Sequence, residues 1–172
     1  MSVFKLARAI RTNDVLATAL ILHDFEGINA QHIYLNDFTP LGFVVTTPDR
    51  DTSLVDVLVD MGADVNFGDE PHRTPLSLSV TYGTPKMAER LVERGANMEA
   101  KDDDGFTPLH KACLMGRTGI TKVLVRCGAD INARTNKGAT PLDYAIDYKR
   151  TDIQKILLQA GAKTSEDVCT IK

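Results

Sequence analysis

The chain has 172 residues, of which 43% are hydrophobic and 25% are charged, a balance typical of a folded protein rather than a disordered one. Its formal net charge of −3 supplies no strong positive field, which argues against binding to a nucleic-acid backbone. No apolar stretch approaches the roughly 18 residues that a membrane-spanning helix needs, so we expect no membrane partner.

The N-terminus and the cysteines indicate the compartment. Residues 1–15 lack the long apolar segment and the small-residue cleavage site of a secretory signal. The three cysteines, Cys113, Cys127 and Cys169, are odd in number and show no C-x-x-C spacing. This pattern favours free thiols over disulfides or a zinc site. We therefore expect a cytoplasmic or nuclear protein.

The chain begins with a degenerate copy of a unit that recurs four times later. When Phe4 is aligned with the first residue of the later units, Ala9 falls on their recurring small residue. This first unit covers about residues 3–30 and is expected to cap the N-terminal end.

Two short motifs then recur with one period. Thr-Pro-Leu begins at residues 39, 74, 107 and 140, with spacings of 35, 33 and 33 residues, and Gly-Ala begins at residues 62, 95, 128 and 161, always 33 residues apart. The two additional residues in the first spacing are expected near residues 47–50, between two helices. Such a period indicates repeated units that bury their apolar faces by packing on their neighbours. We expect one domain over 1–172, with repeats at about 36–67, 69–100, 102–133 and 135–164 and a short tail at 165–172.

Each repeat is interpreted as two helices and a turn. Threonine caps the first helix with its hydroxyl, and proline suits the first turn because its missing N–H would have no partner there. Glycine ends the second helix because it tolerates a left-handed backbone, and Gly105 and Gly138 are expected in the connecting turns. Apolar residues at i, i+3, i+4 and i+7 mark the buried face of the second helix. Three such stripes are Leu54, Val57, Leu58 and Met61; Ile120, Val123, Leu124 and Cys127; and Ile153, Ile156, Leu157 and Ala160.

The fourth unit carries the fullest motif, Thr107-Pro108-Leu109-His110-Lys111-Ala112, followed by Gly128-Ala129-Asp130-Ile131-Asn132-Ala133. This pair of motifs resembles the ankyrin repeat, from about residue 3 to about residue 164. The resemblance implies an all-α fold, an ankyrin-repeat α-solenoid with short β-hairpin loops. The sequence departs from the family at Arg90, where an apolar residue is usual. We expect its stem to pack and its head to reach water.

No residue pattern predicts catalysis. His110 has no nucleophile placed for it and is expected to bridge Thr107 and nearby backbone. The run 102–104 of three aspartates lacks further ligands at a calcium-loop spacing and is expected at a solvated hairpin tip. Cys113 falls on a small, buried column, and the glycines form no phosphate-binding motif. We expect no catalytic residue, no cofactor and no metal, and thus a protein that is not an enzyme.

Two asparagines raise a hypothesis of modification. Asn66 and Asn132 follow Leu58 and Leu124 by eight residues in a Gly-Ala-Asp-x-Asn context, which resembles the substrates of asparaginyl hydroxylases among ankyrin proteins. The alternative, which we favour, is that both side chains only anchor the hairpins through hydrogen bonds.

The resemblance implies that a partner protein binds a concave face made of hairpin tips and the outer positions of first helices. Five large apolar or aromatic side chains on this face favour a binding hot spot over scattered exposed residues. The middle hairpins are acidic, which would steer a basic partner segment, unless they are only a solubilising edge. The expected partner-binding residues are Glu70, Arg73, Tyr82, Asp103, Asp104, Phe106, Leu114, Met115, Lys137 and Tyr148.

These observations predict a protein–protein interaction module that acts as an inhibitor, an adaptor or an assembly chaperone and is a monomer by itself. One alternative is a viral or effector mimic, similar to inhibitor-of-NF-kappaB proteins, that sequesters a host signalling protein. Another is a subunit of a structural scaffold.

Overall fold

The computed structural model describes residues 2–23, 38–47, 52–68 and 73–169. Within these ranges the chain forms helices and no β-strand, so the predicted all-α fold is confirmed. The helices are α1 (Ser2–Arg11), α2 (Val15–His23), α3 (Pro40–Thr46), α4 (Ser53–Asp60), α5 (Pro75–Tyr82), α6 (Pro85–Glu93), α7 (Pro108–Met115), α8 (Thr118–Arg126), α9 (Pro141–Asp147), α10 (Thr151–Gln159) and α11 (Ser165–Cys169).

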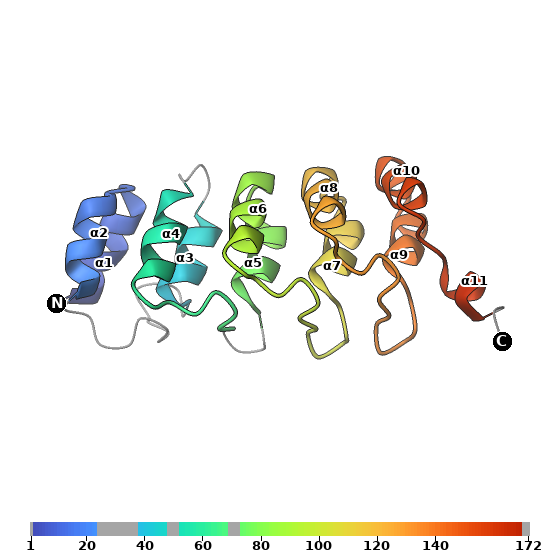
Figure 1. The fold of residues 1–172 in the computed structure, drawn as a ribbon, viewed down its shortest axis with the longest axis horizontal. Coiled ribbons are helices and arrows are strands. Elements are labelled where there is room, and N and C mark those ends of the chain that lie inside the picture. The colour runs from blue at the N-terminus through green and yellow to red at the C-terminus, as the bar shows by residue number, and fades with distance from the viewer. Residues whose placement is uncertain (1, 24–37, 48–51, 69–72, 170–172) are drawn as a thin grey trace. The chain divides into compact units, whose positions relative to one another are not determined.

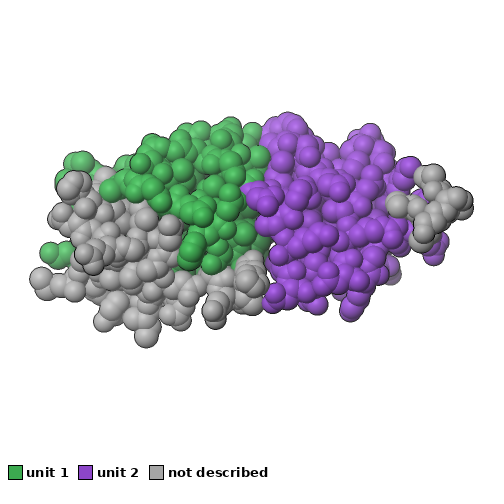
Figure 2. Space-filling view, turned by 60° about the horizontal axis from the view of Figure 1, so that its bottom comes forward, with its two compact units in different colours: residues 1–96 green, residues 97–172 purple. Residues whose placement is uncertain are grey.

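The chain divides into two compact units, Met1–Ala96 and Asn97–Lys172, which Figure 2 shows in different colours. In the first unit α1 packs on α2, α3 packs on α4, and α5 packs on α6 (Figure 1). Neighbouring pairs meet through α2 with α4 and through α3 with α5. In the second unit α7 and α8 form one pair, α9 and α10 form the next, and the pairs meet through α7 with α9 and α8 with α10. First helices therefore pack on first helices, and second helices on second helices.

The recurring threonines and glycines have the predicted local roles. The hydroxyls of Thr39, Thr74, Thr107 and Thr140 each accept a hydrogen bond from the backbone N–H of the residue three positions later. Each of these threonines precedes a proline in the first helical turn. The glycines at 62, 95, 128 and 161 have φ between 88° and 97°, the left-handed region in which a side chain is strained. The period of 33 residues thus repeats the start and the end of each helix pair.

The apolar stripes supply much of the core, although Val57, Met61, Cys127 and Ile156 are only half-buried. Leu54, Leu58, Leu124 and Leu157 are fully buried. Ala160 is exposed, so its place in the stripe was predicted wrongly. It is the C-cap of α10, beyond the last turn whose side chains pack on the core.

The loops at 102–106 and 135–139 are hydrogen-bonded turns, and the structure assigns no strand to either of them. In the first, the Asp102 N–H donates to the Phe106 carbonyl at 3.1 Å, and the Gly105 N–H donates to the Asp102 carbonyl at 2.9 Å. The loop at 135–139 repeats this pattern with Gly138, and both glycines have a φ of 80°. The Asn136 N–H donates to the Asp104 carbonyl at 3.1 Å, which ties the two loops together. The sequence therefore predicted the position of these two turns correctly, but the β-structure expected in them is not formed.

Arg90 reaches the surface, as expected, but also forms ion pairs that the sequence did not indicate. Its guanidinium lies 2.6 Å from the Asp56 carboxylate on α4 and 2.8 Å from the Glu93 carboxylate. Hydrogen bonds to these two carboxylates, more than their charge alone, raise the pKa of Arg90. The head of Arg90 therefore joins two repeats through an ion pair at the protein surface, where its side chain is still 37% exposed.

The expected tail contains a short helix, α11, which is held to the last repeat. Arg134 donates from Nη2 to the Ser165 carbonyl at 3.2 Å. The Ser165 N–H in turn donates to the Asp143 carboxylate at 3.0 Å. Of residues 47–50, where the two additional residues were expected, 48–50 lie outside the described residues, as do residues 24–30 at the end of the degenerate N-terminal repeat.

Candidate protein-binding site

A cluster of three rings lies where α7 meets α9. The rings of Phe106 and Tyr144 have centroids 4.9 Å apart, and the His110 imidazole lies edge-on at 5.9 Å from Phe106 and 6.0 Å from Tyr144. Such aromatic pairs contribute about 0.5–1.5 kcal/mol each beyond the area that they bury. The cluster therefore holds the Phe106 ring in one place before any partner arrives.

The His110 ring lies at the bottom of this cluster and is fully buried. Its Nδ1 accepts a hydrogen bond from the Thr107 N–H at 3.2 Å and lies 2.9 Å from the Thr107 hydroxyl oxygen. Its Nε2 lies 3.1 Å from the Ala139 carbonyl oxygen, to which it donates in the neutral tautomer. Burial lowers the pKa of His110 below its ordinary value, so the ring is neutral near pH 7. The predicted bridge between Thr107 and the backbone is confirmed.

A cleft of about 320 Å³ opens above the ring cluster. It lies between the turn at 104–106, the end of α7, the turn at 135–137 and the outer face of α9. Five of its residues were predicted to bind a partner, and three were not. The predicted ones are Asp104, Phe106, Leu114, Lys137 and Tyr148; the others are Thr135, Asn136 and Tyr144.

The side chains of this cleft differ in exposure and in bonding. Tyr148 is 52% exposed at the end of α9, whereas Phe106 and Leu114 are half-buried. The Asp104 carboxylate and the Lys137 ammonium are exposed, and neither forms a hydrogen bond or ion pair within the described part of the chain. The cleft thus offers a rigid aromatic floor, one exposed aromatic side chain and two charges that a ligand can reach.

The other predicted residues lie outside this cleft. Met115 is 41% exposed at the last residue of α7, and Asp103 is exposed beside Asp104, with its carbonyl accepting from the Asn136 side chain at 2.8 Å. In the first unit Tyr82 is 51% exposed, and the Arg73 guanidinium lies 5.6 Å from the centre of the Phe38 ring. Glu70 lies outside the described residues.

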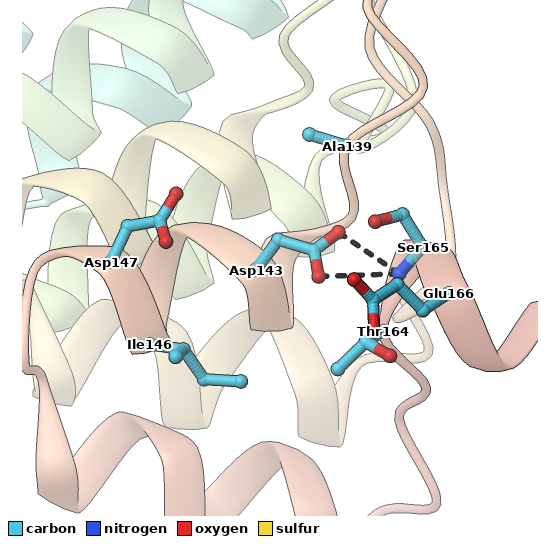
Figure 3. Close-up of a pocket in the computed structure, with 7 residues that line it drawn as sticks. All are labelled: Ala139, Asp143, Ile146, Asp147, Thr164, Ser165 and Glu166. Atoms are coloured by element: carbon cyan, nitrogen blue, oxygen red, sulfur yellow. Dashed lines mark hydrogen bonds between the residues drawn. The ribbon is translucent and has the colours of Figure 1, made fainter.

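A second cleft, of about 400 Å³, lies on the other side of α9 and was not predicted. Figure 3 shows the Asp143 carboxylate directed at the backbone nitrogen of Ser165, with Ile146 and Asp147 on the same helix. Burial alone would raise the pKa of Asp143, but the hydrogen bonds from Thr140 and Ser165 outweigh it and hold this pKa below its ordinary value. Asp143 is therefore ionised and already engaged in holding the chain near α11.

Two family models match the sequence. One described as "Ankyrin repeats (3 copies)" matches residues 95–167, and one described as "Ankyrin repeat" matches residues 72–103. The chain belongs to the ankyrin-repeat family. Ankyrin repeats are protein–protein interaction modules in general, and the two clefts lie within the part of the array that these models match. A search of curated proteins found no match for the ankyrin-repeat chain.

Asp102 and Cys113, which the sequence analysis weighed for chemistry, have surroundings that indicate structural roles. Asp102 lies 2.8 Å from the Lys111 ammonium and accepts from the Phe106 N–H at 2.9 Å. Burial would raise its pKa, but these bonds outweigh it and hold the pKa low. Burial raises the pKa of the Cys113 thiol to about 12, so it is protonated and unreactive near pH 7. Within the described residues no group of three or more His, Cys, Asp or Glu side chains is placed to hold a metal.

The two asparagines of the modification hypothesis both reach the next repeat of their own unit. The Asn66 Nδ2 donates to the Gly95 carbonyl at 3.2 Å, and the Asn132 Oδ1 accepts from the Lys163 N–H at 2.8 Å. Both side chains therefore form the anchoring hydrogen bonds that we favoured over modification. Among the described residues no helix is long and apolar enough to cross a bilayer.

Proposed function

We propose that this ankyrin-repeat protein binds a partner protein through the cleft between α7 and α9, and that it acts by occupying the partner's surface as an inhibitor, adaptor or assembly chaperone. The observation that carries the proposal is that five of the residues chosen from sequence columns alone line one cleft. The alternatives of an inhibitor-of-NF-kappaB-like mimic and of a scaffold subunit share this surface but differ in partner and in self-association.

The cleft has the physical properties of a hot spot. Its aromatic floor is fixed by Phe106, His110 and Tyr144, so little side-chain freedom is lost when a ligand docks on it. Tyr148 is a large amphipathic side chain with half of its surface still exposed, and tyrosine is enriched at such centres. Burying this surface under a partner supplies the hydrophobic part of the binding energy.

The proposal can be tested with peptides selected from a random library displayed on phage. The affinity of the best peptides is then measured for the natural chain, Tyr148→Ala and Phe106→Ala. We expect each variant to bind at least about fivefold more weakly, which corresponds to about 1 kcal/mol. Met115→Ala is expected to show a similar loss if the surface extends along the end of α7.

Leu158→Ala is the matched control, because Leu158 is 58% exposed on α10 of the same unit and lines neither cleft. Circular dichroism should show that the variants fold. Peptides that bind Tyr148→Ala and Phe106→Ala as tightly as the natural chain would place the site elsewhere.

The proposal extends to assembly and compartment. We propose that the free chain is a monomer in the cytoplasm or nucleus, where thiols such as Cys113 and Cys127 remain reduced. A chain that elutes from gel filtration as a dimer or larger oligomer would favour the scaffold alternative instead.

A further inference from the structure

We infer that the partner segment is a basic peptide with an aromatic or aliphatic anchor, and that it crosses α9 so that its cations reach Asp104 on one side and Asp147 on the other. This inference rests on the proposed function, because it specifies the chemistry of the ligand for the same surface.

The two clefts share α9 as their common wall. Tyr144 and Tyr148 stand at i and i+4, on one face of α9 and its end, and Asp147 precedes Tyr148 directly and faces the second cleft. Tyr144 and Tyr148 line the first cleft, and Asp147 lines the second together with Ile146, which is 47% exposed. An extended segment that fills the first cleft can therefore continue across α9 into the second, where Ile146 offers an exposed apolar side chain beside Asp147.

The charged side chains that line these clefts are mostly negative. Four carboxylates line them, against the single ammonium of Lys137. The carboxylates belong to Asp104, Asp143, Asp147 and Glu166. Those of Asp104 and Asp147 are exposed and form no hydrogen bond or ion pair within the described residues, so they are available to a ligand. Asp143 adds its negative charge, although its oxygens are already bonded to Thr140 and Ser165.

Most basic residues of the last repeat lie outside the linings of the two clefts. Arg134 donates to the Ser165 carbonyl, and Arg150 donates from Nη2 to the Leu114 carbonyl at 3.2 Å. Lys149 and Arg150 line a separate cleft of about 230 Å³ with Gly116 and Asp152. Among the described residues, Lys137 is therefore the one cation that lines either cleft, while Arg134 and Arg150 keep their positive charges beside Ser165 and Leu114 and offset part of the negative field.

The aromatic side chains add a second reason for a cationic ligand. An arginine or lysine head over the face of a tyrosine is attracted by the negative face of the ring. Tyr148 has an exposed ring, and the free Asp104 carboxylate lies at the rim of the same cleft. A peptide cation can thus satisfy a ring and a carboxylate together, while a neighbouring apolar side chain packs on Phe106. Charge complementarity of this kind directs which segment binds and in which register.

The test uses the phage-displayed random peptides. It compares the net charge of the peptides whose binding is lost in Tyr148→Ala with that of the unselected library. We expect peptides that bind the natural chain but not Tyr148→Ala to be enriched in arginine and lysine next to aromatic or aliphatic residues. Synthetic copies of these peptides should lose at least fivefold in affinity for Asp147→Asn and for Asp104→Asn. Asp152→Asn is the matched control, since it removes one exposed carboxylate on α10 outside both clefts.

Each outcome decides between the two proposals. Tyr148-dependent peptides that are neutral or acidic would overturn the basic-ligand inference and leave the proposed function standing. Equal losses for Asp147→Asn and Asp152→Asn would also overturn it, because they would indicate attraction to the overall charge of the chain. If no peptide depends on Tyr148 or Phe106, both the inference and the proposed function fail.

Discussion

Replacing His110 with alanine is expected to lower the free energy of unfolding by about 3 kcal/mol. The imidazole makes two hydrogen bonds to backbone atoms, one from the Thr107 N–H and one to the Ala139 carbonyl. Each contributes about 1 kcal/mol when both partners are buried. The ring also packs against Phe106 and Tyr144, which adds about 1 kcal/mol. A loss of this size is a large share of the roughly 5–15 kcal/mol that stabilises a typical domain.

Urea denaturation followed by far-ultraviolet circular dichroism measures this loss. Lys122→Ala is a suitable control, because Lys122 is exposed on α8 and a surface substitution of this kind changes stability by less than about 0.5 kcal/mol. The same ring holds Phe106 in the cleft, so His110→Ala should also weaken peptide binding under conditions where the variant remains folded. If His110→Ala is as stable as Lys122→Ala, the imidazole does not join the two repeats as described.

Three further outcomes are expected. Because burial lowers the pKa of His110, the unfolded chain takes up a proton below about pH 6.5 that the folded chain does not. The stability of the natural chain should therefore fall as the pH drops below that value, relative to His110→Ala, in denaturation curves at pH 7 and pH 5. Gly105→Ala should lower the melting temperature of the chain more than Gly128→Ala does. Both glycines have a positive φ, but only at Gly105 would an added Cβ lie 2.6 Å from the Asn136 backbone nitrogen. Asn132→Ala should cost about 1 kcal/mol through its lost inter-repeat hydrogen bond, and mass spectrometry of natural material should find no added oxygen on Asn132.

Features that depend on neighbouring residues could be predicted from the sequence. Thr107 caps α7, and Gly128 lies in the left-handed region after α8, because both roles are decided within a few residues of the chain. The period then carries these roles to the equivalent positions of the other repeats. For the same reason the outer columns of the repeats identified Leu114 and Tyr148 as members of the cleft.

Features that depend on contacts between repeats could not be predicted in this way. Phe106 was predicted as an exposed side chain, but it is half-buried because Tyr144 of the next repeat packs against it. Tyr144 was missed, although its spacing of four residues from Tyr148 places both on one side of α9. The sequence also did not indicate that the guanidinium groups of Arg134 and Arg150 bond to backbone carbonyls more than thirty residues away.

The most direct test of the account is a nuclear magnetic resonance titration of the isotope-labelled chain with a selected peptide. We predict that the largest shifts of backbone amide signals occur at residues 104–106, 135–137 and 144–148, which surround the cleft between α7 and α9. Shifts that cluster instead on α8 and α10, with those three segments unchanged, would contradict the claim that this cleft binds the partner.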